Sequence, residues 1–563
     1  MKISAIGVNS FRNQRNVNAD NGNKSKCKFF GQPAFQAVPK QFNKELLIIL
    51  DGFGVKSGGK MNPFDVARMP FYKSLVTNAY GDTLYRPIEA SGTYVGLPPK
   101  LAGSSEVGHN NLGAGRMIPQ DLMVIDDAIK DRSFYSNKAF LNAMKNAREN
   151  DKTLHLMTLL SDGFVHSSIK HLHELIRMAA NQHVPSVKVH AFLDGRDCLE
   201  GTAKNFAEQT NKVLNKCGYD EIASFIGMKY PMDRSRNWKN TNVAYDLLVN
   251  GKSRFVARNF DEIYDSIHTF SNTPVEGKWL EKDMPPVKFD GFKPISNGDS
   301  VIFTNYRNDR TRQLTDAITQ RECTAPFLEG QPRLENVHFV CMTEYDPSYH
   351  LPVAFPAQVH SNTLTQVLND QKFNPWVAAE TEKKAHVTFF FDGKRHVEYS
   401  DASYIFPASD HSGNIQPEME ANTLRDVIMS WMEKDRSKAM VVNFANPDMI
   451  GHDNNFDKGV ETLTLLDRIL FRILDNAREK DIATIITADH GNIEDMTHGG
   501  HTNNPVPFIS VLPGCEKFIE EGRVFLDKAK DAAISRVAPS FIDLLKGAKK
   551  PDVMYESMFK MPE

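Results

Sequence analysis

The sequence predicts an α/β protein in which a discontinuous metal-binding domain holds an inserted α/β substrate-binding domain. Strand-like apolar runs alternate with longer amphipathic stretches from residue 44 onward, which is typical of α/β folds. Apolar runs near both ends of the chain lead into Asp or His, whereas the middle of the chain is rich in Arg-containing loops. The length of 563 residues exceeds the usual size of one core, so at least two domains are expected.

The expected strands are short runs of apolar residues. They cover residues 46–50, 153–160, 187–193, 300–304, 337–342, 387–391, 440–444 and 483–488. The expected helices have apolar residues three or four positions apart, and they cover residues 162–180, 203–216, 311–319 and 457–480.

The domain boundaries follow from the candidate metal ligands. Asp51 is early in the chain and Asp448 and Asp489 are late, yet one metal site needs them together. We therefore expect residues 44–119 and 357–563 to form the metal-binding domain and residues 120–356 to form the insert. Polar segments that contain Pro lie near both junctions and are suited to be linkers.

The N-terminal segment, residues 1–43, differs from the rest. It is basic, contains a single acidic residue (Asp20) and has no periodic apolar pattern. We expect a disordered extension. An organelle-targeting peptide is the alternative, although the segment lacks a convincing amphipathic Arg/Ser helix.

Composition argues against several classes of protein. The hydrophobic content of 41% and charged content of 24% are ordinary for a soluble globular protein. The net charge of −3 gives no electrostatic reason to expect a nucleic acid or an acidic membrane as partner. No apolar stretch approaches the roughly 20 residues that span a bilayer. Six scattered cysteines without a C-x-x-C pair fit free thiols in a reducing compartment, and we expect a cytoplasmic location.

Two strand ends carry candidate metal ligands. Asp51 follows the first expected strand, and Asp489 and His490 follow the last one. The carboxyl ends of strands are where open α/β sheets build their sites. The Gly after each motif permits a sharp turn that brings the side chains to one place. The alternative for each motif is a simple turn.

A second group of candidate ligands follows residues 440–444. Asn446 is expected to cap a helix, in which Asp448 and His452 lie one turn apart on the same face. His501 is preferred to the nearby His498, because an Asn-Asn-Pro segment after it would hold its loop rigid. Mixed carboxylate and imidazole ligands suit Zn or Mn, and two clusters suit a paired-metal centre. A capping Asp beside a surface His is the alternative.

Ser105 is the candidate nucleophile. It lies among small residues, Gly103-Ser104-Ser105, that precede an expected helix. A helix start exposes backbone N–H groups to an anion, and a nearby metal can activate a hydroxyl group there. A serine that merely caps the helix is the alternative.

The Arg-rich middle of the chain is the candidate anion site. Each cluster follows an apolar run, and guanidinium groups match carboxylate and phosphate oxygens. The candidate residues are Arg196, Asp197, Arg234, Arg307 and Arg310, with His166 on a further loop. Surface ion pairs are the alternative.

Lys383, in the late part of the chain, could neutralise the charge of a phosphate group. The alternative is that Lys383 is only a charged residue at the end of a strand.

Together these motifs resemble the cofactor-independent (2,3-bisphosphoglycerate-independent) phosphoglycerate mutases of the alkaline phosphatase superfamily, from about residue 44 to the end. The motifs are Leu-Asp-Gly-Phe-Gly (50–54), Ser-Glu-Val-Gly-His-Asn-Asn-Leu-Gly-Ala-Gly-Arg (105–116), Ser-Asp-Gly-Phe-Val-His-Ser (161–167), Phe-Leu-Asp-Gly-Arg-Asp (192–197), Met-Asp-Arg (232–234), Asn-Tyr-Arg-Asn-Asp-Arg (305–310), Ala-Glu-Thr-Glu-Lys (379–383), Asn-Pro-Asp-Met-Ile-Gly-His (446–452), Thr-Ala-Asp-His-Gly-Asn (487–492) and His-Thr-Asn-Asn-Pro-Val-Pro-Phe (501–508).

The resemblance implies a role for each candidate residue. Ser105 would become phosphoserine, and Lys383 would steady the phosphate. Two Mn²⁺ ions, or other divalent metals, would be held by two ligand sets: Asp51, Ser105, Asp489 and His490 for one, and Asp448, His452 and His501 for the other. The glycerate part would be bound by Arg196, Arg234, Arg307, Arg310, His166 and Asp197, of which Asp197 would also carry protons. One departure is Met228, where the family usually has Arg; the adjacent Lys229 could supply the charge.

The activity implied is that of an isomerase, which interconverts 3-phosphoglycerate and 2-phosphoglycerate through phosphoserine in glycolysis and gluconeogenesis. A phosphatase or another phosphomutase of the same superfamily is the alternative, and an inactive phosphoglycerate-binding protein is a third hypothesis. We expect a monomer whose only partner is the small-molecule substrate, with no nucleic acid and no membrane bound.

Overall fold

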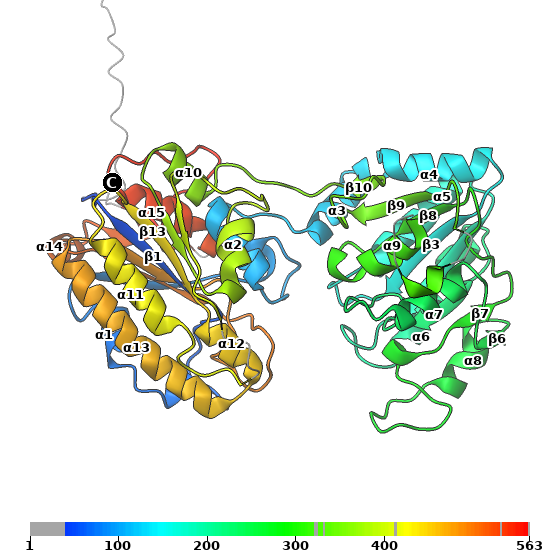
Figure 1. Cartoon of the computed structure of the whole chain (residues 1–563), viewed down its shortest axis with the longest axis horizontal. Helices are drawn as coiled ribbons and strands as arrows, with labels where there is room; N and C mark the ends of the chain where they lie inside the picture. The colour runs from blue at the N-terminus through cyan, green and yellow to red at the C-terminus, as the bar shows by residue number, and fades with distance from the viewer. Residues whose placement is uncertain (1–39, 320–324, 330–332, 410–413, 530–531, 561–563) are drawn as a thin grey trace, which may run out of the picture.

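The protein has two lobes, each built around one large β-sheet, and Figure 1 shows two chain segments that join them. The structure is a computed structural model that describes residues 40–319, 325–329, 333–409, 414–529 and 532–560. Within these ranges, the first sheet has the strand order β12-β11-β13-β1-β14-β15-β2, and the second has the order β10-β9-β8-β3-β4-β5-β7-β6. The predicted α/β class is confirmed.

The first lobe contains residues from both ends of the chain. Its strands are β1 (Glu45–Leu50), β2 (Thr83–Ile88), β11 (Trp376–Ala378), β12 (Ser403–Ile405), β13 (Ala439–Phe444), β14 (Ala483–Thr487) and β15 (Val506–Val511), with a separate pair β16 (Phe525–Leu526) and β17 (Phe559–Lys560). Its helices are α1 (Pro70–Val76), α2 (Ser105–Ala114), α10 (Leu364–Asp370), α11 (Ala421–Met432), α12 (Asn446–Asp453), α13 (Phe456–Glu479), α14 (Glu516–Glu520) and α15 (Val537–Leu544), with short helices η1 (Pro63–Asp65), η2 (Gly92–Val95), η7 (Thr381–Lys383), η8 (His386–Phe390) and η9 (Ile534–Arg536).

Strand β1 is the centre of this lobe and is buried along its whole length. It pairs in parallel with β13 on one side and β14 on the other, so the carboxyl ends of the three strands meet at one edge of the sheet. Helices α11 and α13 cover one face, and α2 and α15 lie on the other (Figure 1). Because helices cover both faces of the sheet, its strands are continuous runs of apolar residues in the sequence.

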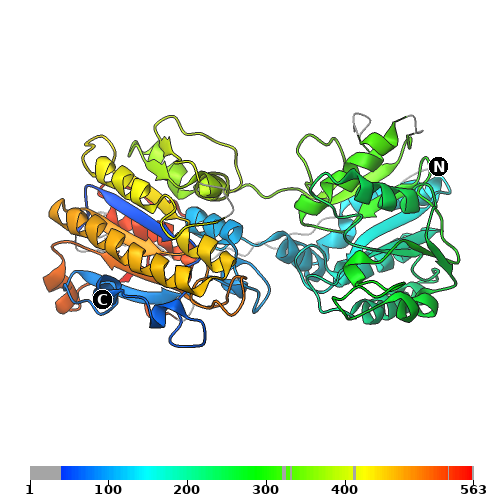
Figure 2. The same ribbon diagram turned by 60° about the horizontal axis from the view of Figure 1, so that its bottom comes forward.

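The second lobe contains the middle of the chain (Figure 2). Its strands are β3 (Leu154–Leu160), β4 (Val187–Leu193), β5 (Ser224–Gly227), β6 (Phe255–Ala257), β7 (Val287–Phe289), β8 (Ser300–Phe303), β9 (His338–Thr343) and β10 (Val353–Phe355). Its helices are α3 (Asp121–Lys130), α4 (Lys138–Glu149), α5 (Ile169–Asn181), α6 (Ala203–Lys216), α7 (Trp238–Leu248), α8 (Phe260–Ile267) and α9 (Arg312–Thr319), with short helices η3 (Ser133–Ser136), η4 (Glu281–Asp283), η5 (Asn308–Arg310) and η6 (Pro326–Leu328). Strands β8, β3, β4 and β5 are parallel neighbours, so the loops after them share one edge.

Three predictions about local structure were wrong. The expected strand at residues 387–391 is instead the π-helix η8 (His386–Phe390). The expected helix at residues 162–180 begins only at Ile169, because residues 161–168 form the loop that carries His166. Asn446 is the first residue of α12 and not its cap, a position that Ala445 occupies.

Part of the predicted N-terminal extension is folded. Residues 1–39 lie outside the described residues, but residues 40–43 pack onto the first lobe. Phe42 is buried, and its backbone N–H donates a hydrogen bond of 2.7 Å to the carbonyl of Leu544. The prediction of disorder was therefore wrong for residues 40–43. The domain boundaries at 119/120 and 356/357 stay predictions. None of the described helices combines the length and apolar character needed to cross a membrane.

Candidate active site

Ser105 is the first residue of α2, at the positive end of the helix dipole. The capping role belongs to its neighbour Ser104, whose side chain accepts a hydrogen bond from the N–H of Val107. The Ser105 hydroxyl is therefore available: it donates to Asp51 Oδ1 at 3.2 Å and lies 3.0 Å from His490 Nε2. The simple capping interpretation of Ser105 is wrong.

Asp51 and Asp489 extend from the ends of β1 and β14 and are fully buried. Gly52 permits their approach to the α12 segment: its φ is +71°, and a Cβ there would lie 2.7 Å from the Cα of Asp448. Asp489 Oδ1 accepts hydrogen bonds from the N–H groups of Gly52 and His490. Its Oδ2 lies 3.3 Å from His490 Nε2 and 3.2 Å from His109 Nδ1.

Three histidines share one arrangement. The Nδ1 atoms of His452, His490 and His501 lie 2.7, 3.2 and 2.9 Å from the carbonyl oxygens of Gly499, Gly491 and Gly103. A carbonyl only accepts, so each ring carries a proton on Nδ1, and the neutral ring then has a lone pair on Nε2. Metal-binding histidines are held in this way. His498, by contrast, is exposed.

These lone pairs converge on carboxylate oxygens. The Nε2 atoms of His452 and His501 are 3.2 Å apart, and they lie 3.4 and 3.5 Å from Asp448 Oδ1. His490 Nε2 lies 3.3 Å from Asp489 Oδ2 and 3.7 Å from Asp51 Oδ1. Acceptors this close together repel one another unless a cation lies among them. The donor set therefore fits divalent metal ions.

Lys383 lies between the two ligand sets. Its Nζ is 2.8 Å from Asp51 Oδ1, 2.6 Å from Asp448 Oδ2 and 3.4 Å from Ser105 Oγ. Burial opposes its charge, but Asp51 and Asp448 raise the pKa of the ammonium above its ordinary value. The π-helix η8 begins three residues later, and such irregular turns are frequent at functional sites.

Two buried residues that we did not single out from the sequence support this centre. Asn492 donates to Asp448 Oδ1 at 3.0 Å. Glu494 accepts from the N–H groups of Gly54 and Asn492 and from the side chain of Asn504. It thereby joins the loops that follow Asp51, His490 and His501. Only the position of Asn492 within the Asp-His-Gly-Asn motif could have indicated this.

The arginines of the second lobe gather around Asp309. Its Oδ2 is 2.9 Å from Arg234 Nη1, and its Oδ1 is 3.2 Å from Arg307 Nε. Burial and the nearby Arg196 and Arg234 lower the pKa of the Arg310 guanidinium, so the positive charges converge. We expected the Asp residues interleaved in the Arg clusters to hold the arginines in place or to act as a base, but did not single out Asp309 for that role.

His166 and Asp197 lie beside these arginines. Burial, and then the charges of Arg307 and Arg310, lower the pKa of His166 to about 4, so the ring is neutral at pH 7. Burial and Asp194 raise the pKa of Asp197 to about 6. His166 Nδ1 and Asp197 Oδ2 are buried without hydrogen-bond partners, whereas Asp309 Oδ1 has Arg307 as its ion-pair partner. Because buried polar atoms normally have hydrogen-bond partners, these atoms of His166 and Asp197 are suited to bind a polar ligand.

Met228 is a core residue and does not face the arginines. It is buried among the apolar side chains behind β4 and β5, including Phe192 and Met232. The adjacent Lys229 forms an ion pair of 3.0 Å with Asp283, so its charge is already partnered.

The structure places the predicted residues in two clusters. Asp51, Ser105, Lys383, Asp448, His452, Asp489, His490 and His501 lie together in the first lobe, and His166, Arg196, Asp197, Arg234, Arg307 and Arg310 lie in the second. Among the described residues, no hydrogen bond or ion pair joins one cluster to the other.

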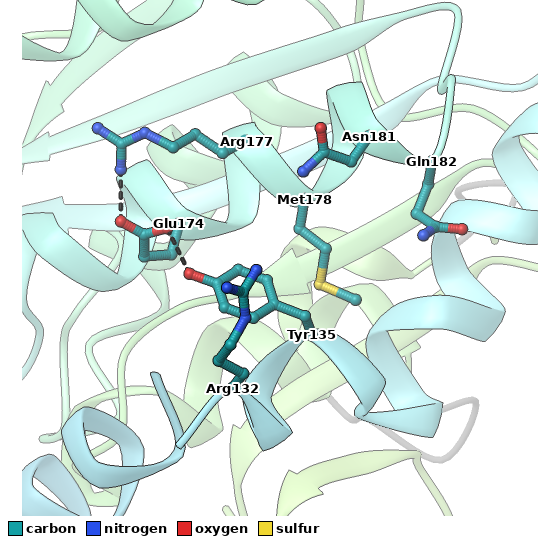
Figure 3. A pocket seen from close by; sticks show the side chains of 7 residues that line it. All are labelled: Arg132, Tyr135, Glu174, Arg177, Met178, Asn181 and Gln182. Carbon is teal, nitrogen blue, oxygen red and sulfur yellow. Dashed lines mark hydrogen bonds and ion pairs between the residues drawn. The ribbon is translucent and has the colours of Figure 1, made fainter. Parts of the chain in front are cut away.

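Figure 3 shows a cavity in the second lobe. Its volume is about 300 Å³, and it is lined by Arg132, Tyr135, Glu174, Arg177, Met178, Asn181 and Gln182. Glu174 accepts hydrogen bonds from the Tyr135 hydroxyl and the Arg177 guanidinium (Figure 3). None of the predicted site residues lines it.

Comparisons with known proteins identify the family of the chain. Residues 125–347 match the family described as BPG-independent PGAM N-terminus. A 2,3-bisphosphoglycerate-independent phosphoglycerate mutase of Clostridium perfringens (strain SM101) is 36% identical over 523 residues, covering 90% of this chain and 97% of its own. The enzyme of that name from Moorella thermoacetica is 37% identical over 509 residues, covering 89% and 95%.

A solved structure is similar over almost the whole chain. It is the phosphoglycerate mutase of Leishmania mexicana at low cobalt concentration, with a TM-score of 0.67, 26% identity and coverage of 93% of this chain and 98% of that one. The identity to the curated relatives extends over nearly their full length. The chain belongs to the 2,3-bisphosphoglycerate-independent phosphoglycerate mutases.

Proposed function

We propose that this enzyme, an isomerase, interconverts 3-phosphoglycerate and 2-phosphoglycerate by passing the phosphoryl group through Ser105. The observation that carries the proposal is the position of the Ser105 hydroxyl, which contacts Asp51, His490 and Lys383 at a helix N-terminus. A hydroxyl group in such a place is held for attack on an anionic phosphoryl group.

The metal ligands fit two divalent cations, which we expect to be Mn²⁺. One would be held by Asp51, Ser105, Asp489 and His490, and the other by Asp448, His452 and His501. When bound, the cations would lower the pKa of the Ser105 hydroxyl and neutralise phosphoryl oxygens. Lys383, whose ammonium contacts Asp51 and Asp448, would add a positive charge beside the phosphoryl group.

The arginine cluster is proposed to hold the glycerate part. Arg196, Arg234, Arg307 and Arg310 would bind carboxylate and hydroxyl oxygens, and the neutral His166 would orient one of them. Ser105, whose hydroxyl proton would be released to solvent when the cations bind, attacks phosphorus through Oγ. The bond between phosphorus and the 3-oxygen of glycerate breaks, and that oxygen receives a proton from protonated Asp197. After glycerate turns, Asp197 takes the proton of the 2-hydroxyl, whose oxygen attacks the phosphoserine and releases Ser105.

The two clusters lie in different lobes, so the reaction requires the lobes to close over the substrate. Closure would also exclude water, which would otherwise hydrolyse the phosphoserine and turn a mutase into a phosphatase. A phosphatase needs the metal cluster alone, whereas the buried polar atoms of His166 and Asp197 that have no hydrogen-bond partner favour retention of glycerate. A cytoplasmic location and a monomeric state stay predictions.

The test is turnover without 2,3-bisphosphoglycerate. Purified enzyme with Mn²⁺ and 3-phosphoglycerate should form 2-phosphoglycerate, which enolase-coupled absorbance or ³¹P NMR detects. Free phosphate in excess of the isomer would favour a phosphatase. Binding of 3-phosphoglycerate without turnover and without a phosphate label on Ser105 would favour a non-catalytic binding protein.

A further inference from the structure

His109 is a fully buried histidine beside the candidate metal ligands, one turn after Ser105 in α2. Its Nδ1 lies 2.9 Å from the Ser105 carbonyl oxygen and 3.2 Å from Asp489 Oδ2. Its Nε2 lies 2.9 Å from the side-chain nitrogen of Asn443. The same amide nitrogen is 2.8 Å from Asp51 Oδ2.

The acceptors fix the protons in this chain. The Ser105 carbonyl can only accept, so the His109 proton is on Nδ1. The Asp51 carboxylate also accepts, so the NH₂ group of Asn443 faces it and uses its second hydrogen on His109 Nε2. The hydrogen bonds therefore run from Asn443 to both Asp51 and His109, and from His109 to the Ser105 carbonyl.

This arrangement differs from that of the three candidate ligand histidines. His452, His490 and His501 donate Nδ1–H to a carbonyl and leave Nε2 free. In His109 the Nε2 lone pair is already taken by Asn443. His109 is close enough to Asp51 and Asp489 to form a third group of metal-type ligands, but neither of its nitrogens is free to bind an ion.

We propose that His109 and Asn443 are positioning residues, which hold the Asp51 carboxylate and the start of α2 in the orientation that metal binding and Ser105 attack require. Asn443 fixes Asp51 Oδ2, so that Oδ1 turns toward Ser105 and Lys383. His109 donates its Nδ1–H to the Ser105 carbonyl, and the same nitrogen lies 3.2 Å from Asp489 Oδ2. This inference rests on the proposed metal-dependent function.

The packing around the pair leaves little freedom to rearrange. A Cβ at the neighbouring Gly108 would lie 2.4 Å from the Asp489 carbonyl oxygen, so α2 directly contacts the strand end that carries Asp489. Asn443 is on β13, which pairs with β1 residue for residue, Ile49 being its partner. The strand register therefore sets the distance between Asn443 and Asp51.

The test is Mn²⁺ binding to the whole enzyme with His109→Gln and Asn443→Leu, measured by isothermal titration calorimetry and by metal analysis after dialysis. Loss of residues that orient ligands typically weakens metal binding by about 10- to 100-fold. We expect that loss with the number of ions bound at saturation unchanged, and with an unchanged KM for 3-phosphoglycerate at saturating Mn²⁺. Asp489→Ala, a ligand variant, should bind one ion fewer, and the exposed His498→Gln should match the wild type.

Wild-type affinity in both variants would overturn the proposal, and so would loss of one ion in His109→Gln, which would make His109 a ligand. Circular dichroism melting separates either result from misfolding, and Asn443→Asp offers a second variant of nearly the same size if Asn443→Leu does not fold. If the wild-type enzyme binds no metal at all, the proposed function fails instead.

Discussion

The Nε2 atoms of His452 and His501 lie 3.2 Å apart, and because both rings are protonated on Nδ1, two lone pairs face each other. Removal of metal should therefore destabilise the first lobe. Mn²⁺ at a hundred times its Kd would add about 2.7 kcal/mol to the free energy of unfolding. We expect a higher Tm in Mn²⁺ than in EDTA, measured by differential scanning fluorimetry. His498→Gln should show the same difference, and an equal Tm in both buffers would contradict the metal assignment.

Replacement of Ser105 tests the nucleophile. Ser105→Ala removes the attacking oxygen, and the rate of isomerisation should fall at least about a thousandfold. Mass spectrometry of enzyme quenched with 3-phosphoglycerate should lose the phosphorylated peptide. Ser104→Ala is the matched control: it removes the helix cap, costs about 1 kcal/mol of stability and leaves the phosphopeptide in place. A phosphopeptide that persists in Ser105→Ala would refute the assignment.

The pH dependence of turnover should reflect Asp197. Burial and Asp194 raise the pKa of this carboxyl to about 6, and in the proposed scheme only its protonated form can give a proton to the leaving glycerate oxygen. The first transfer should therefore slow about tenfold per pH unit above 6. The measurement is kcat against pH at saturating Mn²⁺, with the Tm recorded at each pH to exclude unfolding. A kcat that does not fall between pH 6 and pH 8 would exclude Asp197 as the proton donor.

The same shift predicts an effect on stability. The folded state binds the Asp197 proton more tightly than the unfolded state, so the favourable contribution is present below the unfolded pKa near 4 and is lost as the pH rises through about 6. Above pH 6 the ionised carboxylate costs up to about 3 kcal/mol. Asp197→Asn should thus be inactive but more stable at pH 7.5, and the gain should shrink toward pH 4. A Tm difference independent of pH would contradict this.

Lys383 should be needed most when metal is absent. Its ammonium bridges Asp51 and Asp448, and a buried carboxylate pair without a cation costs about 3–5 kcal/mol. Lys383→Met should lower the Tm strongly in EDTA and less in Mn²⁺, because bound cations replace the missing charge. The exposed neighbour offers the control: Lys384→Met should change the Tm little in either buffer. Equal losses with and without metal would argue against shared carboxylates.

Much of the metal centre could be predicted because its ligands end buried strands. Asp51 and Asp489 follow β1 and β14, which are neighbours in one parallel sheet, and Asp448 and His452 are one helical turn apart. The residues that contact the ligands without binding metal themselves could not be predicted in the same way. Asn443 lies inside the apolar run of β13, where its polarity was a signal that we passed over.

The strand predicted at residues 387–391 was wrong because the residue types there favour a strand locally. Val, Thr and three Phe residues in succession favour a strand, but tertiary packing favours a helix there: a Cβ at Gly113 of α2 would lie 1.9 Å from the Phe391 carbonyl oxygen. The sequence also did not distinguish Asp309 from the other Asp residues of the Arg clusters. Only the convergence of the loops after several strands shows that it serves two arginines.

The main-chain tethers of the ligand histidines make their tautomers resistant to mutation. Each Nδ1 proton goes to a glycine carbonyl, and a carbonyl is present whatever side chain stands there. Side-chain substitutions in these loops therefore leave Nε2 as the free nitrogen, unless a substitution moves the backbone. A substitution at Gly103 or Gly491 would move the backbone, since a Cβ at either position would lie 2.3 Å from its nearest neighbouring atom. The orientation of His501 and His490 therefore depends on these two glycines as well as on the ligands themselves.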